Sequence, residues 1–162
     1  MARAGHGGGV STPPLPFRRE YPEAPRVGVG AVVLHEGQVL LVRRGGRPSP
    51  GKWSLPGGLV ELGETTEEAV CREISEECAC DILLVGICGV IDRIVRDAEG
   101  RVRYHYVLVD YLAYPRSATI AAGSDAADAM WFPLDRVDEL DVTEGLTDMI
   151  RRALELAEEE RA

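Results

Sequence analysis

Residues 58–80, GLVELGETTEEAVCREISEECAC, carry the clearest helix signal of the chain and an unusual gathering of carboxylates. Thr65 and Glu68 match a capping box, in which the first side chain and the second side chain each bond the other's backbone N–H. The pattern therefore predicts a helix from residue 66 to about residue 78. An apolar stripe with a spacing of four gives this helix a buried face and consists of Val70, Ile74 and Cys78.

Three glutamates of this helix, Glu73, Glu76 and Glu77, stand at positions i, i+3 and i+4 and so project from one face. Like charges at these spacings repel, and each pair costs a few tenths of a kcal/mol. A divalent cation would relieve the repulsion, because hard cations such as magnesium bind carboxylate oxygens. A solvated acidic face is the alternative, and the spacing alone does not separate the two.

The composition of the 162 residues, 45% apolar and 28% charged, is typical of one soluble globular domain. The net charge of −9 argues against a general nucleic-acid binder, because a phosphate backbone attracts a basic surface. The first residues have no apolar core of a secretion signal, and the longest nearly apolar run, 82–91, is too short to span a bilayer. We interpret the four clustered cysteines as buried thiols, and we expect a cytoplasmic protein that does not bind membranes.

The order of elements predicts the architecture. Residues 1–25 lack periodicity, so we expect a flexible or loosely docked arm followed by one domain over 26–162. The β-branched and alternating segments are a hairpin at 26–44 and strands at 53–55, 82–95, 102–113 and 129–132. A helical turn at 133–140 and an amphipathic helix at 146–160 complete the chain. This order favours a mixed sheet flanked by helices.

The spacing around the acidic helix resembles the signature of the Nudix hydrolases, Gly-x5-Glu-x7-Arg-Glu-U-x-Glu-Glu-x-Gly-U, where U is a bulky aliphatic residue. Six fixed positions match, and they are Gly58, Glu64, Arg72, Glu73, Glu76 and Glu77. Ala79 and Cys80 depart from the pattern, which has glycine and an aliphatic residue there. Glycine suits a left-handed helix end that costs alanine about 1–2 kcal/mol, so we expect this helix to end differently, about one residue later.

The resemblance implies an α/β/α sandwich with a central mixed β-sheet, and a hydrolase that uses magnesium or manganese. Its members cleave a nucleoside diphosphate linked to another group. ADP-ribose, giving AMP and ribose 5-phosphate, is the single substrate we expect. A nucleoside triphosphate pyrophosphohydrolase that clears damaged nucleotides is the alternative within this class, and a non-catalytic nucleotide sensor is the alternative outside it. The expected partner is a small nucleotide and not a nucleic-acid polymer, and a homodimer is left open.

The resemblance also assigns roles to the motif residues. It implies that Glu73, Glu76 and Glu77 bind the metal, with the carbonyl of Gly57 as a further ligand. It implies that Arg72 orients a glutamate through paired hydrogen bonds. Gly58 and Glu64 are either structural or close to the metal, and the residue that activates water is not assigned.

Outside the motif, Asp125 is a candidate additional acid, with a turn-forming aspartate as an equal alternative. Phosphates need cations, and the candidates near the motif are Arg43, Arg44, Lys52 and Arg93. The alternating segment 103–111, RYHYVLVDY, has one polar and aromatic face. We interpret it as a sheet surface, with a face toward a base or a partner subunit as the alternative.

Overall fold

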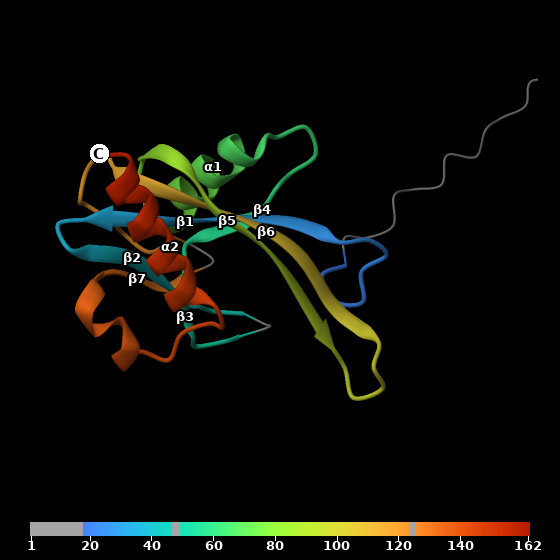
Figure 1. The fold of residues 1–162 in the computed structure, drawn as a ribbon. Helices are drawn as coiled ribbons and strands as arrows, with labels where there is room; N and C mark the ends of the chain where they lie inside the picture. Colours follow the sequence, from blue (N-terminus) through green and yellow to red (C-terminus); the bar gives the residue numbers. More distant parts are fainter. Residues whose placement is uncertain (1–17, 47–48, 124–125) are drawn as a thin grey trace, which may run out of the picture.

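A computed structural model describes residues 18–46, 49–123 and 126–162, and these residues form a mixed sheet between two helices (Figure 1). The elements in chain order are β1 (Arg26–His35), β2 (Gln38–Arg44), β3 (Trp53–Ser54), β4 (Gly57–Leu59), α1 (Thr66–Cys78), β5 (Ile82–Arg96), β6 (Val102–Pro115), β7 (Ala126–Pro133), the 3-10 helix η1 (Leu134–Glu139) and α2 (Leu146–Glu159).

The sheet runs in the order β3-β2-β1-β6-β5, with β4 also paired to β1 and β7 to β2. β1 and β6 are parallel, and their register places Gly30 beside Asp110. The remaining pairs are antiparallel. β1 and β2 are joined by a two-residue turn at Glu36 and Gly37, both with positive φ, as a tight hairpin requires. This register brings residues from β1, β4 and β6 to one place in the sheet.

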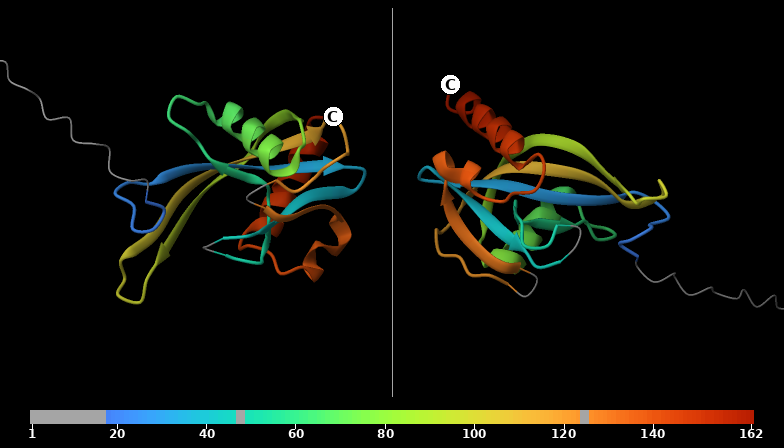
Figure 2. Two further views of the ribbon diagram at one scale, coloured as in Figure 1. Left: turned by 180° about the vertical axis from the view of Figure 1, so that it is seen from behind. Right: turned by 90° about the horizontal axis from the view of Figure 1, so that it is seen from below.

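Each face of the sheet packs against one helix, as Figure 2 shows from behind and from below. Side chains of β1 alternate between the faces, so Ala31 and Val33 are buried toward α1 while Val32 is buried toward α2. The stripe of Val70, Ile74 and Cys78 on α1 is fully buried in the first core. The mixed sheet and the sandwich architecture that the sequence predicts are therefore confirmed.

Strands β5 and β6 form a long hairpin that extends away from the helices (Figure 1). β5 is one continuous strand with irregular pairing near Gly86 and Gly89, which bends it. The segment before β1 docks on this hairpin. The backbone N–H of Tyr21 donates to the Arg103 carbonyl at 2.8 Å, and the hydroxyl of Tyr104 donates to Glu20 at 2.6 Å. Within the expected arm, residues 1–17 lie outside the described part of the chain.

Helix α1 ends at Cys78, and Ala79 adopts the left-handed conformation with φ 51° and ψ 35°. The expectation of a later helix end is therefore wrong. Cys78 and Cys80 on either side are buried in the core, and the Cys78 carbonyl accepts a hydrogen bond from the N–H of Ala121 at 2.9 Å. These contacts hold the chain in a conformation that alanine alone disfavours.

The four cysteines are free thiols. Cys78 and Cys80 are buried as the sequence predicts, whereas Cys71 and Cys88 are only partly buried, so the expectation of buried thiols is wrong for these two. No helix in the described ranges is long and apolar enough to cross a membrane.

Candidate active site

The start of helix α1 is built by local hydrogen bonds. The backbone N–H of Glu68 donates to the Thr65 hydroxyl at 3.1 Å, and the Thr65 N–H donates to the Glu68 carboxylate at 2.9 Å. This is the predicted capping box. The capping box fixes where α1 begins. Because the loop between β4 and this point is short, the acidic face of the helix lies beside the glycine turn of β4.

Arg72 connects this loop to the helix. Its Nη2 donates to Glu64 Oε2 at 3.0 Å, its Nε donates to the other oxygen of the same carboxylate, and Nη2 also donates to the Leu59 carbonyl at 3.1 Å. Its Nη1 donates to Glu73 Oε1 at 3.0 Å. The hydrogen bonds that Arg72 donates to Glu64 lower the pKa of the Glu64 carboxyl and raise the pKa of Arg72 itself. Glu64 therefore ties the loop to the helix, which is the structural role that the sequence left open.

The three helix glutamates lie along the same wall but have different partners. Glu77 accepts a hydrogen bond from the Gly57 N–H at 2.9 Å, and Glu76 is exposed, with Arg72 Nη1 3.3 Å from its Oε2. Glu73 lies against Gly58, where any side chain would collide with its carboxylate. Among the described residues, no three acidic, histidine or cysteine side chains already stand as a closed ligand set.

The donor set at this wall nevertheless fits a hard divalent cation. It offers carboxylate oxygens of Glu73, Glu76 and Glu77, and such ions prefer oxygen ligands. The missing side chain of Gly58 leaves the space that the Glu73 carboxylate occupies. At Gly57 a side chain would collide with the Val29 carbonyl, so the backbone of the turn approaches β1 closely.

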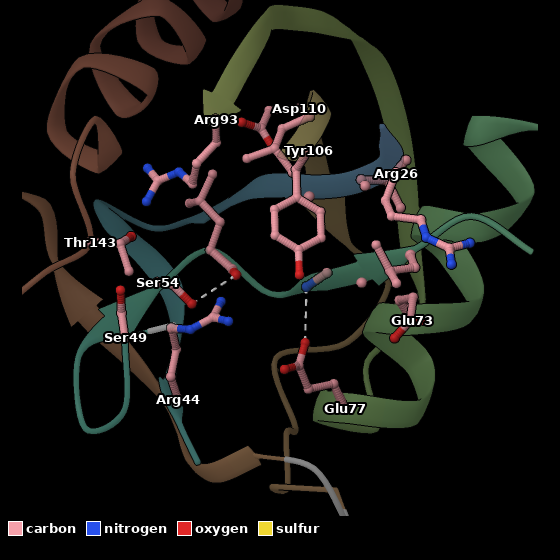
Figure 3. Close-up of a pocket in the computed structure, with 18 of the residues that line it drawn as sticks. Arg26, Arg44, Ser49, Ser54, Glu73, Glu77, Arg93, Tyr106, Asp110 and Thr143 are labelled. Carbon is pink, nitrogen blue, oxygen red and sulfur yellow. Dashed lines mark hydrogen bonds between the residues drawn. The ribbon is translucent and has the colours of Figure 1, made fainter. Parts of the chain in front are cut away.

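The acidic wall belongs to a pocket of about 1290 Å³ that extends between β1, β4, β6 and the segment before α2. Figure 3 shows Glu73 and Glu77 on one side of this pocket and Arg93 and Asp110 on another, with Tyr106 between them. A pocket larger than the usual 300–1,000 Å³ of small-molecule sites accommodates an extended ligand.

Two of the four candidate phosphate-binding cations line this pocket. Arg44 faces it from β2 and Arg93 from β5, where Arg93 Nη2 donates to the Glu144 carbonyl at 2.5 Å. Burial lowers the pKa of Arg44, while the charge of Glu77 opposes that shift. Arg43 is exposed outside the pocket, and Lys52 pairs with Asp141 at 3.5 Å, also outside it. Asp125 lies outside the described residues.

The pocket contains residues that the sequence interpretation did not select. Ser54 and Asp110 are the two buried polar side chains of the described chain, and both line it. Tyr106 lines the pocket as well, and Leu108 and Asp110 follow it on β6 by two and four residues. The alternation in segment 103–111 was the available signal, since residues 106, 108 and 110 share one face of a strand. That face turns toward the pocket here and is not an outer sheet surface.

Comparison with known proteins places this geometry in a family. The sequence profile of the NUDIX domain matches residues 24–153. An ADP-ribose pyrophosphatase of Methanocaldococcus jannaschii is 35% identical over 116 residues, which are 72% of this chain and 66% of that protein. A MutT-like protein of Streptomyces ambofaciens is 30% identical over 110 residues, 68% of this chain and 64% of the relative. The chain spans about half to two thirds of the length of such curated relatives.

Solved structures agree with these matches. The MutT NUDIX hydrolase of Burkholderia pseudomallei superposes with a TM-score of 0.64 at 37% identity, over 83% of this chain and 98% of that one. The NUDIX domain of Shewanella oneidensis NrtR, in complex with ADP ribose, superposes with a TM-score of 0.67 at 27% identity, over 86% and 93% of the two chains.

Proposed function

The chain belongs to the Nudix hydrolase family, and from that premise we propose that it hydrolyses the diphosphate linkage of a nucleoside diphosphate joined to another group. The observation that carries the proposal is the placement of opposite charges in one pocket. The carboxylates of Glu73, Glu76 and Glu77 form one wall, and the guanidinium of Arg44 approaches from β2. A diphosphate calls for both, because the carboxylates would hold a divalent metal ion that offsets part of its negative charge and the guanidinium would balance the rest.

Glu73, Glu76 and Glu77 would hold magnesium or manganese at this wall, with the Gly57 carbonyl as a further ligand. When bound, such an ion neutralises charge on the diphosphate and lowers the pKa of a coordinated water molecule. The protein supplies the positions of the ligands. Arg72 fixes the Glu73 carboxylate from one side while Gly58 leaves room for it on the other, and the Gly57 N–H orients Glu77.

Arg44 is the residue that we assign to the diphosphate. It lines the pocket, and burial lowers its pKa while the charge of Glu77 opposes that shift, so the two side chains interact electrostatically. In Figure 3 they enter the same part of the pocket from opposite sides. A guanidinium in this position binds phosphate oxygens through paired N–H donors and stays charged at any relevant pH.

ADP-ribose is the substrate that we propose. The similarity to an ADP-ribose pyrophosphatase and to a NUDIX domain in complex with ADP ribose supports this choice, as does a pocket whose volume of about 1290 Å³ suits a ligand of this size. The products would be AMP and ribose 5-phosphate.

A nucleotide panel with product analysis tests the proposal. Purified protein is incubated with ADP-ribose, a uridine diphosphate sugar, ATP and dGTP in magnesium, in manganese and in EDTA. We expect ADP-ribose to be cleaved fastest, and only with a metal. If pyrophosphate were released from ATP or dGTP faster than ADP-ribose is cleaved, ADP-ribose would be rejected as the substrate in favour of a triphosphate. Full activity in EDTA would show that the glutamates do not act by binding a metal ion.

A further inference from the structure

Asp110 of β6 contributes a carboxylate to the pocket that is separate from the glutamates of the acidic helix. Its side chain is only 7% exposed, yet it lines the pocket. The parallel register sets it beside Gly30 of β1, where an added Cβ would lie 2.6 Å from Asp110 Oδ1. The absence of a side chain at Gly30 therefore leaves the space in which this carboxylate stands.

The Asp110 carboxylate has no hydrogen-bond donor among the described residues. Arg93 is the cation that acts on it, but the Arg93 guanidinium donates to the Glu144 carbonyl in the segment before α2. Burial raises the pKa of Asp110 to about 6, which shows that the protein solvates its charge poorly. Buried polar groups are normally bonded, because an unbonded one lowers the stability of the fold. An unbonded acceptor that faces a ligand pocket can obtain its donors from the ligand.

We infer that Asp110 is a specificity-determining residue that accepts hydrogen bonds from the nucleoside part of the substrate. The inference rests on the proposed function, which places the diphosphate at Glu73, Glu77 and Arg44. Figure 3 shows Asp110 and Arg93 on the side of the pocket away from these glutamates, where the nucleoside of a bound substrate would extend.

The chemistry of the group that Asp110 binds follows from the carboxylate. The two carboxylate oxygens of Asp110 can accept two hydrogen bonds from neighbouring N–H or O–H groups. A nucleoside offers such groups at the exocyclic amino group of its base or at the vicinal hydroxyls of its ribose. Arg93 lies beside the same space as a donor, so the two side chains together favour a group that presents both donors and acceptors.

Equilibrium binding tests the inference separately from catalysis. Titration calorimetry in EDTA uses AMP, GMP and their 2′-deoxy forms with the unmodified chain, Asp110→Asn, Asp110→Ala and Asp92→Asn. Asp92 is the matched control, because it is an exposed carboxylate on the neighbouring strand and does not line the pocket. We expect the Asp110 variants to bind the preferred nucleotide about 10- to 100-fold more weakly, and Asp92→Asn to bind it normally.

The comparison of nucleotides identifies the donor. If the ribose supplies it, the 2′-deoxy form binds the unmodified chain weakly and Asp110→Ala weakens it no further. If the base supplies the donor, the unmodified chain binds the 2′-deoxy form well. Asp110→Ala then lowers the affinity for the 2′-deoxy form as much as it lowers the affinity for the ribonucleotide. Asp110 variants that bind all four nucleotides like the unmodified chain would overturn the inference, as would a chain that binds none of them.

Turnover of ADP-ribose with magnesium, measured on the same proteins, separates the two proposals. Asp110-dependent binding without any hydrolysis would leave the inference standing and remove the proposed function. Hydrolysis with unchanged KM in both Asp110 variants would do the reverse. Circular dichroism confirms that each variant is folded before it is compared.

Discussion

The guanidinium of Arg72 holds both carboxylate oxygens of Glu64, eight residues earlier, while its other nitrogen reaches Glu73 on the next position of the helix. One side chain thus joins the glycine loop, the start of α1 and a proposed metal ligand. Both partners are largely shielded from solvent, with side-chain exposures of 24% and 18%. The planar fork of arginine makes this arrangement possible, and lysine cannot reproduce it.

Arg72→Lys should therefore lower turnover about 10- to 100-fold, since residues that orient metal ligands contribute at this level. The charge is kept, so the loss would report geometry. Arg151→Lys is the control, because Arg151 makes comparable pairs with Asp148 and Glu155 on the exposed side of α2. Equal kcat values for Arg72→Lys and the unmodified chain would show that Glu73 does not need this support.

Glu73→Gln, Glu76→Gln and Glu77→Gln should each reduce kcat about 100-fold or more, because each removes a ligand charge and keeps the shape of the side chain. Magnesium should raise the melting temperature of the unmodified chain by mass action, and this rise should shrink in Glu73→Gln. Glu67→Gln, an exposed glutamate in the first turn of the same helix, should change neither measurement. Normal activity of any of the three variants in saturating magnesium would exclude that residue as a ligand.

Arg44→Met and Arg43→Met form a matched pair of neighbours, one lining the pocket and one exposed outside it. Arg44→Met should lower kcat/KM for ADP-ribose about 10- to 100-fold, because it removes a charge-assisted bond to phosphate. Arg43→Met should leave kcat/KM unchanged. The assignment of Arg44 to the diphosphate fails if the two variants behave alike.

Asp110→Asn should change the pH dependence of stability. The pKa of Asp110 is raised from 3.8 to about 6, so between these values the folded state holds the proton more tightly than the unfolded state does. The free energy of unfolding contributed by this group is therefore full below pH 3.8 and is lost as pH rises through about 6. Relative to the unmodified chain, Asp110→Asn should gain about 2 kcal/mol between pH 4 and pH 7.5.

Urea unfolding at the two pH values measures this gain. Asp92→Asn, at the exposed position on β5, should show no such gain. A constant difference between Asp110→Asn and the unmodified chain at both pH values would mean that the carboxylate is solvated well.

Ala79→Gly should raise the free energy of unfolding by about 1 kcal/mol, since glycine adopts the left-handed helix end without the steric cost that alanine bears. Ala79→Val should lower it, because a β-branched side chain tolerates positive φ less well. Thermal or urea unfolding of the three proteins gives the order directly. A loss of stability in Ala79→Gly would indicate that the flexibility of glycine in the unfolded chain outweighs the relief of strain.

The acidic helix and the fold class can be predicted from the order of the amino acids. The start of α1 depends on Thr65 and Glu68, three residues apart, and the common face of Glu73, Glu76 and Glu77 depends on helical geometry alone. Interactions of this kind act within one or two turns, so they can be predicted from the order of residues. The β-branched run at the start of the hairpin likewise predicted the first strand of the sheet, observed as β1.

Which residues share the pocket depends on how distant segments of the chain pack together. Arg44 lines it and Arg43 does not, because neighbours on a strand point to opposite faces and the pairing of β2 sets which face is inside. Asp110 meets Gly30 only through the parallel register of β1 and β6, across 80 residues of chain. Ala79 is left-handed because distant contacts anchor Cys78 and Cys80. Pairings between remote segments depend on the packing of the whole sheet, and no short stretch of sequence contains that information.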